Sequence, residues 1–118
     1  MKWFVSNIHW IIGFAGVWTT GNGILHDIFV LAQKRPYERE LIRLLIDGHL
    51  LIFSGVIFLL CYKYVQQGHP LALWICFANS LFLLTYCALI FKILPAVGMI
   101  LINIIVLVAV TGAIAAQK

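Results

Sequence analysis

Charged residues are scarce in this chain. They make up 10% of its 118 residues, whereas soluble domains carry roughly 25%. Aliphatic and aromatic residues make up 64% of the chain and the mean hydropathy is +1.05. A composition this apolar excludes a soluble fold and predicts an integral membrane protein. Because one helical crossing of the bilayer takes about 20 residues, the chain has room for four crossings and no second domain.

Catalytic and redox motifs are also missing. The sequence has no HExxH, no nucleophile motif, no glycine-rich phosphate loop and no paired metal-ligand spacing. Its three cysteines, Cys61, Cys76 and Cys87, lie in apolar stretches without a CxxC spacing. We therefore expect buried thiols, of which Cys61 and Cys76 could approach each other across a hairpin, and an enzymatic role is disfavoured.

The net charge of +4 does not indicate nucleic-acid binding, because no basic run interleaved with aromatic residues accompanies it. In a membrane protein such an excess records orientation and contact with anionic lipid head groups. We therefore expect the lipid bilayer as a partner, together with a second copy of the chain or a larger membrane protein, and no nucleic acid.

Four apolar segments predict an all-α, up-down bundle of four transmembrane helices that forms a single domain over residues 1–118. Pro36 is a helix-start signal for the second segment, and two glycines around Asn22 predict a break in the first. The predicted helices cover residues 8–32, 37–62, 71–91 and 95–115, with a tight turn over residues 92–95.

Basic residues near the predicted helix ends favour one orientation. The side that holds the first and third connections carries Lys34, Arg35, Arg39, Arg43 and Lys92, and the opposite side carries Lys2, Lys63 and Lys118. Since basic residues concentrate on the cytoplasmic side, both termini are expected on the non-cytoplasmic side of a plasma or inner membrane.

Polar residues that face each other across the predicted hairpins share one depth of the bundle. At about 1.5 Å of rise per residue, counting outward from a turn near residue 37 places His26 opposite His49. Counting across the other turns extends this layer to His26, Asp27, Asp47, His49, Tyr86 and Asn103. A second layer nearer the midplane contains Thr20, Asn22, Ser54, Asn79, Ser80 and Thr111. Such residues are expensive inside a membrane and mark candidate functional sites.

The start of the second helix has a more ordinary interpretation. Arg39, Glu40, Arg43 and Asp47 follow one stripe, so the first turns of this helix are expected to be wet. Asp47 is then an interfacial residue paired with Arg43, and the asparagines and hydroxyls of the second layer are packing contacts between helices.

Three functions remain open from the sequence. In the first, a protonatable polar pocket binds or moves a small molecule or ion, with His26, Asp27, Asp47, His49, Tyr86, Asn103, Asn22 and Asn79 as its residues. In the second, the chain is an accessory subunit of a larger membrane complex. In the third, His26 and His49 are the axial ligands of a haem or bind a metal between facing helices. The sequence indicates no other cofactor. An acid–base enzyme acting on lipid ranks below these three.

Overall fold

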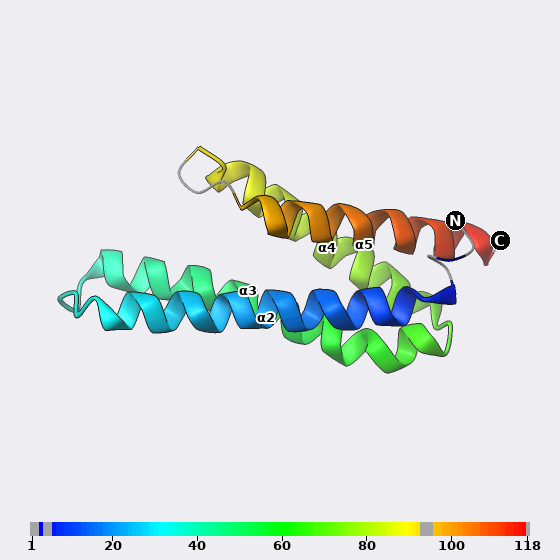
Figure 1. Cartoon of the computed structure of the whole chain (residues 1–118), viewed down its shortest axis with the longest axis horizontal. Coiled ribbons are helices and arrows are strands. Elements are labelled where there is room, and N and C mark those ends of the chain that lie inside the picture. Colours follow the sequence, from blue (N-terminus) through cyan, green and yellow to red (C-terminus); the bar gives the residue numbers. More distant parts are fainter. Residues whose placement is uncertain (1–2, 4–5, 93–95, 118) are drawn as a thin grey trace.

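The computed structural model describes residue 3, residues 6–92 and residues 96–117. The chain folds there into four helices, α2 (Ile8–Ala32), α3 (Arg39–Gln66), α4 (Pro70–Ile90) and α5 (Val97–Ala116). Consecutive helices run in opposite directions along the molecule (Figure 1). The predicted all-α fold with four helices is therefore confirmed.

Three of these helices, α3, α4 and α5, are long and apolar enough to cross a membrane. Helix α2 is not among them; polar residues are spread along it, including Asp27 on its buried side. The structure thus supports membrane association through three helices.

The helix boundaries differ from the predicted ones mainly in α3. It begins at Arg39, two residues later than predicted, because Glu38 has an extended backbone (φ −135°, ψ 173°). It continues to Gln66 and ends where Gly68 takes the left-handed conformation (φ 77°). The N–H of His69 donates to the Tyr64 carbonyl and that of Gly68 to the Val65 carbonyl, which is a Schellman motif.

The other boundaries agree within one or two residues. The first helix matches its predicted limits, and α4 and α5 are each displaced by one or two residues. The predicted start at residue 95, much of the turn over residues 92–95, and Lys2 and Lys118 lie outside the described residues.

The predicted break near Asn22 is wrong. Helix α2 is continuous from Ile8 to Ala32. The Asn22 side-chain amide donates to the Trp18 carbonyl one turn earlier, at 2.7 Å, so it bonds within the helix. Gly23 serves close packing against α3, as its neighbours show below.

Glycines hold α2 and α3 closely together along their length. A Cβ on Gly23 would lie 2.6 Å from the Gly48 carbonyl oxygen and 2.8 Å from the backbone nitrogen of Ile52. A Cβ on Gly55 would collide with the Thr20 hydroxyl and lie 2.8 Å from the Gly16 carbonyl oxygen. Two helices in such close contact need small residues at their seam, as is common in membrane proteins.

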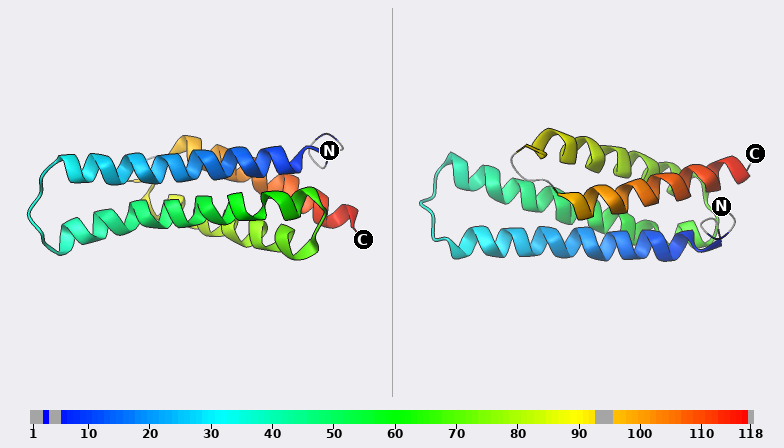
Figure 2. Two further views of the ribbon diagram at one scale, coloured as in Figure 1. Left: turned by 90° about the horizontal axis from the view of Figure 1, so that it is seen from below. Right: turned by 45° about the horizontal axis from the view of Figure 1, so that its top comes forward.

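The four helices form two hairpins of unequal length. The α2–α3 hairpin extends at its connecting loop beyond the α4–α5 hairpin (Figures 1 and 2). The ends of α2 and α5 nearest the termini lie at the opposite end of the molecule. The first two turns of α3, with the end of α2 beside them, therefore project past α4 and α5.

The core between the helices is apolar, and so is much of the outer surface. Ile12, Phe58, Leu73, Leu83 and Val106 are fully buried between the helices. Large apolar side chains also point outward from all four helices, among them Phe14, Phe53, Leu71, Leu89 and Leu101. Apolar side chains on both faces are typical of helices buried in lipid.

Candidate functional site

Asp27 is the only carboxylate among the described residues that lies buried at the seam of two helices. It projects from α2 toward α3 and is 8% exposed. Its carboxylate occupies the space beside Gly48, where a Cβ would collide with it. Glycine at position 48 thus makes the room that the carboxylate fills.

His49 holds one oxygen of that carboxylate. Its ring atom Nδ1 lies 2.8 Å from Asp27 Oδ2 and 2.8 Å from the Leu45 carbonyl oxygen. Both neighbours accept hydrogen bonds, so the geometry assigns a proton to Nδ1. In the neutral ring Nε2 is then an open acceptor, and the side chain is 72% exposed. His49 therefore connects the buried carboxylate to the outside of the helix pair.

His26 lies beside the other oxygen. Its Nδ1 is 3.7 Å from Asp27 Oδ1. Neither of these two buried atoms has a hydrogen-bond partner among the described residues. Asp27 thus sits between two imidazoles, one tightly bound from α3 and one close by on α2. We call His26, Asp27 and His49 the acid–imidazole cluster.

Asp47 lies outside the acid–imidazole cluster. The Tyr86 side chain of α4 interacts with the Asp47 carboxylate. Two residues along a helix turn the side chain by about 200°, so Asp47 and His49 project from opposite faces of α3. The single polar layer that the sequence predicts is therefore split by α3 into the acid–imidazole cluster and an Asp47–Tyr86 pair.

Asn103 joins neither group. It is fully buried in α5, and its amide donates to the Met99 carbonyl of its own helix at 2.8 Å. It makes no hydrogen bond to the cluster in the described part of the chain, and its place in the predicted layer stays a prediction. Its carbonyl oxygen has no hydrogen-bond partner among the described residues.

The second predicted layer is partly structural. The Asn79 amide donates to the Ser54 carbonyl at 2.9 Å and so joins α4 to α3, while Asn22 bonds only within α2. Ser80 is buried, whereas Thr111 is exposed. Thr19 is fully buried and was not among the predicted site residues, although its spacing of three and seven residues from Asn22 and His26 puts it on their stripe.

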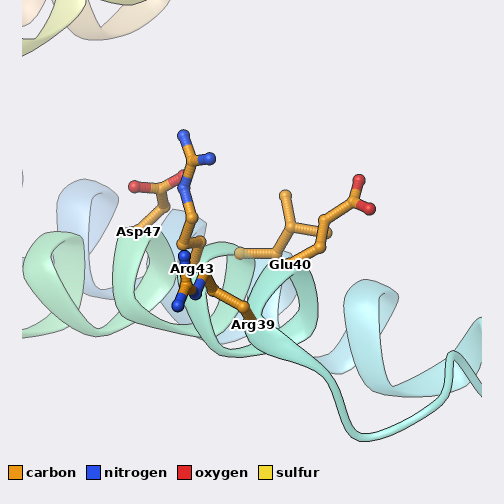
Figure 3. Close-up of a pocket in the computed structure, with 5 residues that line it drawn as sticks. Arg39, Glu40, Arg43 and Asp47 are labelled. Atoms are coloured by element: carbon orange, nitrogen blue, oxygen red, sulfur yellow. The ribbon is translucent and has the colours of Figure 1, made fainter.

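A hollow of about 390 Å³ lies along the start of α3 (Figure 3). Its lining residues are Arg39, Glu40, Arg43, Leu44 and Asp47. The four polar residues of the stripe predicted to be wet all line this hollow. The expected Arg43–Asp47 ion pair is not formed in the described part of the chain, where Glu40 instead pairs with Arg35 at 3.4 Å.

The remaining candidates for site chemistry are the cysteines and the possible metal ligands. Cys61 and Cys76 are free thiols whose side chains interact across α3 and α4, as their positions predicted. The described residues contain no group of three or more His, Cys, Asp or Glu side chains that could hold a metal ion. The pairing of His26 and His49 on a haem or metal stays a prediction. Each ring has its Nδ1 near Asp27, so Nε2 would be the atom that binds iron or another metal.

The acid–imidazole cluster is the arrangement with the clearest chemistry. A carboxylate between two imidazoles can pass a proton from one ring to the other, and imidazole changes charge near neutral pH. No known protein family, curated protein or solved structure matches the chain. The functional argument therefore depends on the geometry of this cluster.

Proposed function

We propose that this protein is an integral membrane protein of four crossings that binds or moves a small molecule or ion in exchange for protons at the acid–imidazole cluster. The observation that carries the proposal is the 2.8 Å contact between His49 Nδ1 and the buried Asp27 carboxylate. Both termini lie on the non-cytoplasmic side in this proposal, as the basic residues favour.

The position of the cluster supports a role beyond structure. Inserting an ionisable residue at the centre of a membrane helix costs about 2.5 to 3.5 kcal/mol, so such residues are kept where they are used. Asp27 and His26 both lie on α2, the described helix that is not among those long and apolar enough to cross a membrane. The crossing of α2 is then stabilised by packing its polar side against α3, which the seam glycines permit.

The two imidazoles differ in a way that suits proton transfer. The His49 side chain is 72% exposed, whereas that of His26 is 28% exposed. A proton taken up at the His49 ring can reach Asp27 directly and then His26 after a small movement of its ring. Since one four-helix chain encloses little volume, movement of a solute larger than a proton calls for a second copy of the chain.

Proton movement is the direct test. The purified protein is reconstituted into vesicles that contain a pH-sensitive dye, and a potassium diffusion potential drives protons inward. The protein is expected to raise the rate of acidification above that of empty vesicles. Asp27→Asn is expected to lower this added rate at least about tenfold, because a neutral amide cannot accept the proton.

The matched control is Glu40→Gln, which makes the same change of group at an exposed acid outside the cluster. It is expected to leave the rate unchanged. Vesicles that acidify no faster than empty ones would overturn the proposal. So would Asp27→Asn with an undiminished rate, or Glu40→Gln with the same loss.

A further inference from the structure

The hollow on α3 faces the space beyond the end of the α4–α5 hairpin. Its lining residues all come from the first two and a half turns of α3, from Arg39 to Asp47. These turns project past the shorter hairpin (Figure 2). The hollow is therefore open on one side and walled by charged side chains on the other.

Two arginines supply its positive charge. Arg39 and Arg43 are one turn apart on α3 and both line the hollow. In Figure 3 the Arg43 side chain rises from the helix, the Arg39 guanidinium lies below it near the ribbon, and Glu40 points away from both. Glu40 is paired with Arg35 of the loop at 3.4 Å, and Asp47 is engaged with Tyr86. Within the described residues no carboxylate lies within ion-pair distance of either Arg39 or Arg43.

The depth of the hollow along α3 fits the membrane surface. At 28 residues α3 is about 42 Å long, longer than the ~30 Å hydrocarbon core. From Leu50 to Cys61 α3 contains no Asp, Glu, Lys, Arg or His. We therefore assign this part of the helix to the hydrocarbon. Arg39 and Arg43 then lie at the level of the lipid head groups.

We propose that this hollow binds the phosphate group of an anionic phospholipid. Guanidinium groups bind phosphate oxygens through paired hydrogen bonds, and two of them one turn apart can share one phosphate. The volume of about 390 Å³ admits a head group. This inference rests on the membrane crossing of α3 and is independent of proton chemistry at Asp27.

Native mass spectrometry of the protein in mixed micelles tests the proposal. Phosphatidylglycerol is titrated against phosphatidylcholine with the same acyl chains, and the dissociation constant of the first bound lipid is measured. Phosphatidylglycerol is expected to bind more tightly. Arg43→Gln is expected to weaken it about fivefold, and Arg39→Gln with Arg43→Gln roughly 25-fold, at about 1 kcal/mol for each cation.

Lys34→Gln is the matched control. It removes one positive charge from the adjacent loop but lies outside the hollow, and it is expected to change the constant by less than about twofold. Arg43→Lys keeps the charge but loses the planar fork, so it is expected to weaken binding measurably, but less than Arg43→Gln.

Three outcomes would overturn the proposal. Equal losses for Lys34→Gln and Arg43→Gln would show general attraction to a charged surface. Full binding by Arg43→Lys would show that no bidentate site exists. Displacement of the lipid by an equal concentration of glycerol phosphate would show that a soluble phosphate is the ligand. None of these results depends on the acidification rates measured for the unmodified protein and Asp27→Asn. This proposal and the proposed function can therefore fail separately.

Discussion

The two hairpins of this protein are built on different principles. The α4–α5 hairpin carries no acidic or basic residue within its helices, and apolar side chains such as Leu83 and Val106 fill its contacts. The α2–α3 hairpin contains the buried carboxylate, both cluster histidines and the arginine-lined hollow. It is joined by glycines that bring the two backbones together.

The difference shows how a small membrane protein can keep a charge inside. In an apolar pair such as α4–α5, an acid would face only hydrocarbon. In the α2–α3 pair the space freed by Gly48 lets Asp27 reach an imidazole of the facing helix. One hairpin therefore has apolar contacts and no charged side chain within its helices, and the other holds the ionisable cluster.

Gly23→Ala is the substitution expected to damage the α2–α3 pair most. Its Cβ would meet backbone atoms of Gly48 and Ile52, which cannot move without separating the helices. Overpacking of this kind costs about 1 to 3 kcal/mol. The loss is measured as the change in unfolding free energy in detergent.

Gly21→Ala is its control two residues away on the same helix. Nothing lies within 4 Å of a Cβ at that position, so helix propensity alone acts and stability is expected to rise by up to about 1 kcal/mol. Similar losses for both variants would mean that the seam does not depend on close approach.

Gly48→Ala is expected to have a smaller effect on stability and a large one on function. Its methyl group displaces the Asp27 carboxylate, a side-chain end that can rotate aside, so the cost is about 1 kcal/mol. The displaced carboxylate loses its 2.8 Å contact with His49. Proton flux in vesicles should therefore fall toward that of Asp27→Asn; a folded variant with full flux would contradict the role of this contact.

Asn79→Leu tests the link between the two hairpins, and the smallest effect is expected here. It removes the 2.9 Å bond to the Ser54 carbonyl, and such bonds between membrane helices average about 0.6 kcal/mol. Thr85→Val removes a bond within α4, from an exposed hydroxyl to the Leu81 carbonyl. It should be close to neutral, and a loss equal to that of Asn79→Leu would mean that the interhelix bond adds nothing.

Hydrophobic segments and their interruptions were enough to predict four helices and the approximate limits of each. The predicted end of α3 was wrong because a backbone conformation, and not hydrophobicity, determines where this helix ends. The polar residues after Tyr62 suggested the end of α3, but nothing in them opposes a helix, and the positive φ of Gly68 ends it only after Gln66.

The candidate site was predicted in part. Counting depth along the hairpins put Asp27 and His49 in one layer, because depth depends only on the rise of each helix, and the two side chains are in contact. It set His26, however, and not Asp27, directly opposite His49. Counting gives no information on helix rotation or side-chain direction. Asp47 therefore faced Tyr86 instead of the cluster, and Asn103 bonded to its own helix. The sequence near Gly23 predicted a helix break, because the residue it packs against, Gly48, is 25 positions away and local sequence cannot show that contact.

In a membrane crossed as proposed above, the unequal lengths of the hairpins would also make the protein responsive to bilayer thickness. Helix α4 has 21 residues against 28 in α3, a difference of about 10 Å in length. A bilayer matched to α4 leaves the start of α3 in the aqueous boundary. A thicker one draws the boundary toward the arginines and carries Asp27 and His49 deeper into hydrocarbon. Hydrophobic mismatch is thus coupled to the solvation of the acid–imidazole cluster.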